Sequence, residues 1–206
     1  MVVGSNPTWR ANKYNMKYVI AQYLEDVSWS RDLAGEVFVI KKEENSEFLN
    51  NKFMPNIGKE SYTYISFIVE NYERLDGNYC FLQGNPFDHA NHDTIFEEIV
   101  QQENSGKDFM YFNPFGRDFF GSGGNGWPDH VGLRLDEYFK RIFGFRLGFY
   151  AFFAGAQFVV PASSIKSRSK EFYERLMEMH EEYDDFPCVM ERIWGYIFNR
   201  SLNVVI

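Results

Sequence analysis

The residues best suited to chemistry follow a short apolar run near the middle of the chain. Residues 80–82 read Cys-Phe-Leu, and Gln83, Asn85, Asp88 and His89 come soon after, with Gly and Pro between them. Such an order predicts a buried strand that ends in a turn. Ligands of open α/β sheets bind beyond the carboxyl ends of the strands. This cluster is therefore typical of a site for a sugar, a phosphate or a metal ion.

Asp88 and His89 offer a carboxylate and an imidazole in adjacent positions. Such a pair can coordinate a divalent metal, or it can act as a base and its orienting group. With His92 and Asp93 it forms an Asp-His-x-x-His-Asp pattern whose spacing could hold a metal, so manganese or magnesium is a candidate cofactor. In the alternative interpretation, Asp88 caps a turn and His89 bonds a backbone carbonyl.

Asn56, Lys59 and Glu60 precede a segment with helical periodicity. The free N–H groups at a helix start favour an anion, so Lys59 could pair with a phosphate there. The plainer interpretation is a helix cap in which Glu60 compensates the helix dipole.

Four polar or aromatic residues in the second half of the chain are further candidates. Gln157 interrupts an apolar strand pattern, so its amide needs either a bound sugar or a backbone partner. Glu191 could be a general base that activates a hydroxyl. Alternatively, Glu191 and Arg192 form structural ion pairs. Trp194 fits the core, although its ring could also stack on a sugar.

The elements that must position these residues alternate between strand and helix. Strands are expected at 17–23, 36–40, 79–82, 149–153 and 157–161, and helices around 59–72, 94–100, 133–143, 164–183 and 187–198. Residues 104–129, rich in Phe and Gly, are expected to form a long loop over one face of the sheet. This order predicts an α/β fold, a single three-layer domain with a mostly parallel central sheet.

Composition restricts the function classes. The net charge of −8 argues against general nucleic-acid binding, and the two cysteines are too few for a disulfide framework. No stretch reaches transmembrane length, so a cytoplasmic location is expected. Residues 1–15 lack periodicity and are expected to be a disordered or over-extended start before the domain at 16–206, with Met16 as the initiator.

Three segments carry a family resemblance: PNIGKESYTY at 55–64, FLQGNPFDH at 81–89 and GAQFVV at 155–160, continued by FYERL at 172–176 and ERIWGYIF at 191–198. In this order the set resembles a widespread family catalogued as a domain of unknown function. The chain is more distantly similar to GT-A-type nucleotide-sugar glycosyltransferases, which implies a GT-A-like fold. This likeness implies that residues 18–26 meet the nucleotide.

The same likeness implies roles for three later positions. Residues 83–85 would stand at the metal motif, 155–158 would be the acceptor segment and Glu191 the late acid. The family's Asp-x-Asp reads Gln-Gly-Asn here and lacks both carboxylates.

These observations lead to one function and two alternatives. The chain is expected to transfer a sugar from a nucleotide donor to a hydroxyl acceptor, with Asn85, Asp88 and His89 at the diphosphate and Gln157 at the acceptor. One alternative is a carbohydrate- or protein-binding module that uses the aromatic segment 109–120. The other is a metal-dependent hydrolase built on residues 88–93.

Overall fold

The structure is a computed structural model that describes residues 16–42, 52–54, 57–88, 94–104, 110–111, 119–122, 132–146, 149–152 and 155–198. Strands and helices alternate along much of the chain. Their order is β1 (Met16–Gln22), β2 (Glu36–Lys42), β3 (Lys52–Met54), α1 (Lys59–Asn71), β4 (Asn78–Gln83), α2 (Ile95–Asn104), β5 (Met110–Tyr111), β6 (Phe119–Ser122), α3 (Leu135–Phe143), β7 (Phe149–Phe152), β8 (Phe158–Pro161), α4 (Ala162–Ile165), α5 (Lys170–Glu182) and α6 (Phe186–Phe198).

The main sheet is open and mostly parallel, as the sequence predicts. Its strand order is β3-β2-β1-β4-β8-β5. Strands β3, β2, β1 and β4 run parallel to one another, whereas β8 is antiparallel to both β4 and β5. Strands β6 and β7 form a separate antiparallel pair. The chain is thus an α/β protein.

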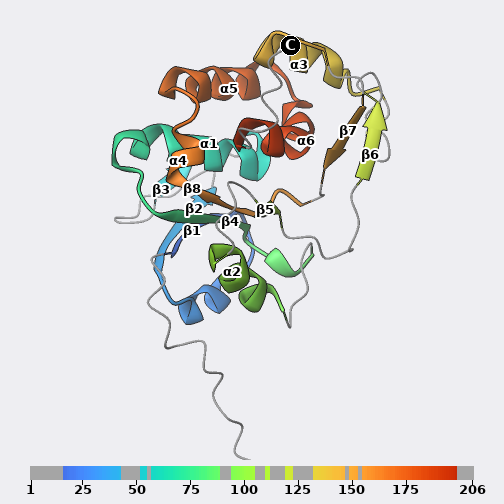
Figure 1. The fold of residues 1–206 in the computed structure, drawn as a ribbon. Helices are drawn as coiled ribbons and strands as arrows, with labels where there is room; N and C mark the ends of the chain where they lie inside the picture. The colour runs from blue at the N-terminus through green and yellow to red at the C-terminus, as the bar shows by residue number, and fades with distance from the viewer. Residues whose placement is uncertain are drawn as a thin grey trace, which may run out of the picture.

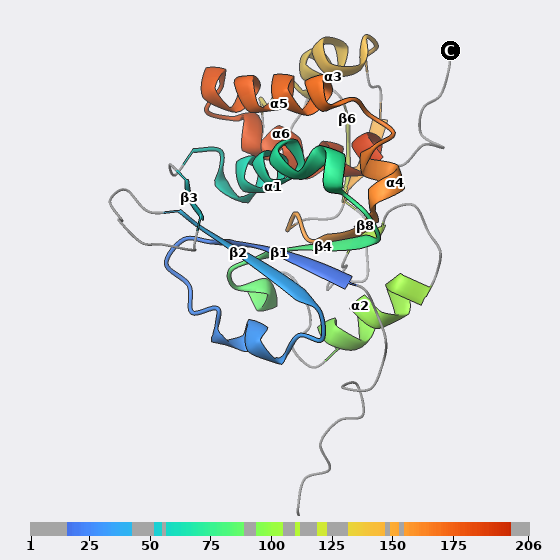
Figure 2. The same ribbon diagram turned by 90° about the vertical axis from the view of Figure 1, so that its left-hand side faces the viewer.

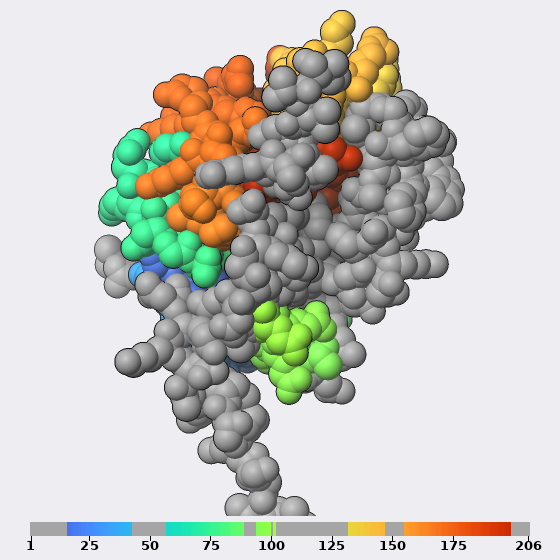
Figure 3. Space-filling view, in the orientation of Figure 1, coloured from blue at the N-terminus to red at the C-terminus, as the bar shows by residue number. Residues whose placement is uncertain are grey.

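Helices lie on both faces of the main sheet because its central strands are apolar on both sides. Val19 and Phe81 pack into a large core with α1, α5 and α6, whereas Ile20 and Leu82 face a smaller core with α2. Figures 1 and 2 show α1, α5 and α6 on one side of the sheet and α2 on the other. In the space-filling view, α2 reaches the surface well apart from α5 and α3 (Figure 3).

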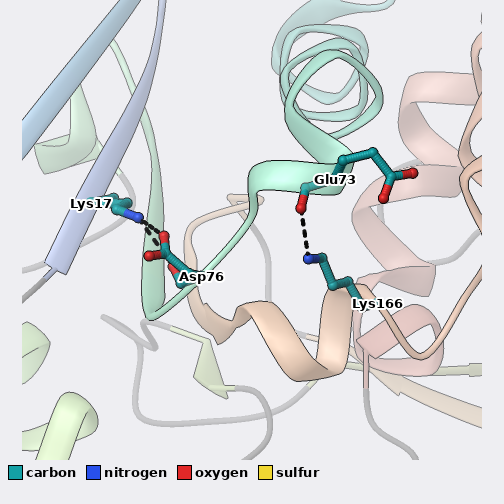
Figure 4. A network of polar contacts seen from close by, with 4 residues as sticks. All are labelled: Lys17, Glu73, Asp76 and Lys166. Carbon is teal, nitrogen blue, oxygen red and sulfur yellow. Dashed lines mark hydrogen bonds and ion pairs between the residues drawn. The ribbon is translucent and has the colours of Figure 1, made fainter.

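Two lysine contacts stabilise the chain at the amino-terminal ends of β1 and β4. Lys17 of β1 forms an ion pair with Asp76, which precedes β4. Lys166, after α4, donates to the backbone carbonyl of Glu73 at 3.2 Å (Figure 4). Both contacts hold the connection between α1 and β4 in place at this end of the sheet. The candidate site lies at the opposite ends of the same two strands.

Two short strands correct the sequence predictions. Met110 and Tyr111 form β5 beside β8, and residues 119–122 form β6, so the segment 104–129 is not a loop throughout. Strand β3 was not predicted at all. Two to four residues are too few to show an alternating pattern, and these strands are defined by pairing with another strand. The expectations for residues 1–15 fall outside the described residues.

No helix of the described residues combines the length and the apolar composition that a membrane span requires.

Candidate functional site

A cleft opens at the carboxyl ends of the central strands. β1 lies between β2 and β4 and runs parallel to both, so the strand order reverses there. At such a switch point the connections leave in opposite directions and a crevice forms between them. The cleft has a volume of about 390 Å³. It is lined by Ala21, Gln22, Tyr23, Glu25, Lys42, Lys59, Glu60, Gln83, Gly84, Asn85 and Asp88.

Four of the residues predicted from sequence meet in this cleft. Lys59 comes from the start of α1, Gln83 ends β4, and Asn85 and Asp88 follow β4. The strand ends lie side by side because Ala21 of β1 pairs with Gln83 of β4. Residues that are distant in sequence are thus brought to one edge of the sheet.

The turn after β4 is held by its own polar side chains. The Asn85 amide nitrogen donates to Asp88 Oδ1 at 2.8 Å, and Asn85 Oδ1 accepts from the Phe87 N–H at 3.3 Å. Asp88 is exposed and ends the short 3-10 helix 86–88. These contacts match the local, turn-capping interpretation of Asp88. The Asp88 side chain nevertheless lines the cleft.

Glu25 approaches the opposite wall of the cleft at Gly84. Its Oε2 accepts from the Tyr23 N–H at 2.7 Å. A Cβ added at Gly84 would lie 2.6 Å from this oxygen and 3.2 Å from the Ala21 carbonyl oxygen. Trp29 fixes the same segment from outside, since its indole N–H donates to the Gly84 carbonyl at 3.0 Å. Residue 84 therefore has room for hydrogen only.

We expect Gly84→Ala to displace the Glu25 side chain while the fold survives. The new methyl group would push against a flexible carboxylate, so the free energy of unfolding should fall by only about 1 kcal/mol. The Tyr23 amide should lose its acceptor, which a shift of its amide proton resonance would reveal. Glu25→Gln serves as the control that alters the same acceptor without adding a methyl group. An unchanged Tyr23 resonance in Gly84→Ala would contradict the expected displacement.

Lys42 is a cleft residue that the sequence reasoning missed. It is 3% exposed, and its Nζ donates to the carbonyl of Ile57 at 2.7 Å and to the carbonyl of Lys59. In the same turn, Gly58 and Lys59 adopt left-handed backbone conformations, with φ of +65° and +50°. The buried ammonium thus supports the turn that starts α1. Burial lowers the pKa of Lys42 to about 8, partly offset by the nearby Glu60 carboxylate.

Glu60 contributes a carboxyl group whose pKa is raised. Burial is the main cause and the like charge of Glu191 adds to it, whereas Lys59 and Lys42 act in the opposite direction. A carboxyl group with a raised pKa beside a cleft has the properties of a proton-transfer group. Glu60 also stands in the first turn of α1, where a hydrogen bond from its own backbone N–H lowers the pKa and so opposes the effect of burial.

Gln157 is engaged on both sides by the backbone around the end of β4. Its Oε1 accepts from the Gln83 N–H at 3.3 Å, and its Nε2 donates to the Pro86 carbonyl at 3.0 Å. The residue is 1% exposed and does not line the cleft. The backbone-partner interpretation therefore describes these contacts, and Gln157 positions the turn that carries Asn85 and Asp88.

The three candidates on α6 are not among the residues that line the cleft. Glu191 accepts from the Gly155 N–H at 2.9 Å, and Arg192 donates to the Cys188 carbonyl at 2.8 Å and to Glu191 at 3.3 Å. The Arg192 side chain has no exposed surface, and neither does Trp194, which stacks on Phe198. Trp194 is a core residue rather than a stacking surface for a sugar. Arg192 likewise has no surface that a substrate could contact.

The remaining predicted ligands lie outside the described residues. These are Asn56, His89, His92 and Asp93. Among the residues that the structure does describe, no three His, Cys, Asp or Glu side chains gather in a way that could hold a metal ion. The metal interpretation of Asp88 and His89 thus stays a prediction.

Two other hollows run along α3 and α5. They have volumes of about 130 and 540 Å³ and share Arg141. Its guanidinium donates to Glu182 at 2.6 Å and also contacts the Tyr183 hydroxyl. The charge that these hollows share is therefore already paired with neighbouring side chains.

Comparisons with known proteins identify no relative. No family model matches the chain, and no curated protein or solved structure proved similar to it. What can be assigned is the class: an α/β protein with an open, mostly parallel sheet and a polar cleft at the strand switch point.

Proposed function

We propose that the cleft binds a nucleotide sugar and that the protein transfers the sugar to a hydroxyl acceptor. The observation that carries this proposal is the meeting of Lys59, Gln83, Asn85 and Asp88 at the carboxyl ends of β1 and β4. Ammonium groups suit a phosphate, and amides and carboxylates suit the hydroxyl groups of a sugar. A GT-A-like, single three-layer domain that acts in the cytoplasm is part of the same proposal.

The roles of individual residues follow from their positions. Lys59 would contact the diphosphate, and Asn85 would orient the donor beside Asp88. A divalent metal, if bound near Asp88, would supply charge neutralisation for the leaving diphosphate. The acceptor hydroxyl needs a base, for which the sequence predicts Glu191. Glu60 is the second candidate, because it lines the cleft and its pKa is raised.

A thermal-shift screen of nucleotide sugars, with and without manganese, tests the proposal. Stabilisation by a uridine or guanosine sugar donor, lost in Asn85→Ala and retained in Lys140→Met on α3, would support it. Stabilisation by manganese alone would favour the hydrolase. No stabilisation by any nucleotide sugar would contradict the transferase and favour the binding module.

We expect Glu60→Gln to reduce sugar transfer by at least about tenfold at saturating donor, with donor affinity largely unchanged. Glu191→Gln should have a smaller effect, because the substituted amide oxygen can still accept from the Gly155 N–H and because Glu191 does not line the cleft. Rates measured under donor saturation would compare the two variants. A greater loss in Glu191→Gln would return the role of base to Glu191.

A further inference from the structure

The ammonium group of Lys42 has one more hydrogen than its partners among the described residues use. A charged lysine carries three N–H donors. Within the described residues, Lys42 donates to two acceptors, the carbonyls of Ile57 and Lys59. The residue also lines the cleft. A third N–H is therefore left for an acceptor in the cleft, on a side chain that the fold has almost completely removed from solvent.

Lys59 brings a second positive charge to the same part of the cleft. Its backbone is held by Lys42, and its exposed side chain lines the cleft. The start of α1 adds the positive end of the helix dipole. A buried and an exposed ammonium group thus lie at the same turn. Two neighbouring positive charges suit a ligand group that carries two adjacent negative charges.

The carboxylates that line the cleft are not all placed where they would repel a negatively charged ligand group at the lysines. Glu25 accepts a hydrogen bond from the Tyr23 N–H, and Asp88 accepts one from Asn85; both residues follow β1 or β4, whereas the lysines belong to β2 and α1. Glu60 directly follows Lys59 in the chain, and burial raises the pKa of its carboxyl group. The cleft therefore has a cationic part and a part rich in hydrogen-bond acceptors.

We propose that Lys42 and Lys59 bind the diphosphate of the donor directly, without a bridging metal ion. The inference rests on the proposed function, because it names the groups that hold the donor in the same cleft. It adds a ligand class that can be tested alone, inorganic pyrophosphate. The donor's sugar and ribose hydroxyls would then face Gln22, Glu25 and Asn85.

Lys42 gives this binding a characteristic pH dependence. Its pKa of about 8 means that the ammonium is lost as the pH rises from 7 to 9. Diphosphate affinity should then fall by about tenfold over this range. The titratable groups that face Lys42 are Glu60 and Lys59 on α1 and His180 on α5, with Tyr23, Glu25 and Asp88 across the cleft. The pKa of His180, lowered to about 4, lies well below this window.

Calorimetric titration of the full chain with pyrophosphate and with uridine and guanosine diphosphates, all in EDTA, tests the inference. We expect binding without metal. Lys59→Met should weaken it by about tenfold or more, and Lys140→Met, which removes an exposed charge on α3, should leave it unchanged. Lys42→Met should weaken binding similarly and abolish its pH dependence between 7 and 9.

Lys42→Met also removes the buried donor to the carbonyls of Ile57 and Lys59, so it could fail to fold. The pH profile of the wild type and of Lys59→Met then decides, because both retain Lys42 and both should lose affinity as the pH rises. A flat profile, or binding that needs manganese, would overturn the inference and leave the transferase proposal intact. Pyrophosphate binding without any nucleotide-sugar binding would support the inference and overturn the transferase proposal.

Discussion

Replacing Gly58 by alanine is expected to destabilise the protein by about 2–5 kcal/mol. Gly58 has φ of +65°, a conformation that costs alanine about 1–2 kcal/mol. An added Cβ would also lie 2.4 Å from His180 Cδ2 and 2.8 Å from Tyr62 Cβ. The imidazole cannot easily move away, since Ser61 and the Leu176 carbonyl hold its two nitrogens at 2.8 and 2.7 Å. Denaturant unfolding would measure the loss.

Gly144→Ala is the matched control for this substitution. Gly144 has φ of +86°, but no atom of the described residues lies within 4 Å of an added Cβ, so this variant should show the backbone cost alone. Combining Gly58→Ala with His180→Ala should recover part of the loss in a double-mutant cycle. Equal losses at Gly58 and Gly144 would mean that the contact with His180 contributes nothing.

The protein should lose about 3 kcal/mol of stability between pH 6.5 and 4 through His180 alone. Burial lowers the pKa of this imidazole from 6.5 to about 4, with the Lys42 charge acting in the same direction and the bond to the Leu176 carbonyl opposing both. The unfolded chain takes up a proton near pH 6.5 and the folded chain only near pH 4. The folded state thus binds fewer protons between these values, so its stability falls as the pH falls.

His180→Gln should flatten this part of the stability profile. Chemical unfolding of both proteins at several pH values between 4 and 7 would isolate the histidine. The raised pKa of Glu60 has the opposite effect on stability, because the folded carboxyl group takes up its proton at a higher pH than the unfolded one. This effect is the same in both proteins and cancels in the difference between their stability profiles. Parallel profiles for the two proteins would show that the imidazole is not held neutral.

The hydrogen bonds around His180 explain why the ring is poised in this way. Its Nδ1 must donate to the Leu176 carbonyl, so a neutral ring accepts at Nε2 from Ser61. The Ser61 hydroxyl also contacts the Gly58 carbonyl at 2.7 Å, yet it has one hydrogen for both acceptors. Protonation would satisfy every group, and it is opposed by burial and by the positive charge of Lys42.

Long, strongly patterned elements could be predicted from sequence, whereas short ones could not. Apolar runs gave β1 and β4, and helical periodicity gave α1, because both signals extend over several residues. Strands β3 and β5 have three and two residues, and they exist only through pairing with strands elsewhere in the chain. The antiparallel direction of β8 likewise depends on the path of the chain and carries no local signal.

The candidate site was predictable where polar residues follow a strand directly. Gln83, Asn85 and Asp88 follow β4 and line the cleft, as expected. Lys42 was missed because it follows Lys41 in a charged, Asn-rich run that looks like a solvated loop. The usable signal was the two-residue period of a strand, which puts Lys42 on the same face as the buried Ile40.

Residue type misled where burial decides the role. An indole can stack on a sugar and a guanidinium can bind a phosphate, but Trp194 and Arg192 have side chains without exposed surface. The periodicity of α6 places both among apolar neighbours, and only the packing of α1, α5 and α6 shows that the helix has little free face.

Because Cys80 is fully buried, the rate at which its thiol can be labelled reports opening of the fold. This free thiol lies in the centre of β4 with no exposed surface, and burial raises its pKa well above the usual value. A thiol reagent can reach it only when the sheet opens, so the rate of labelling measures how often the molecule opens. Cys188 is partly exposed and would react first. Replacing Cys188 by serine would leave Cys80 as the single thiol, so that its labelling alone would report opening of the sheet.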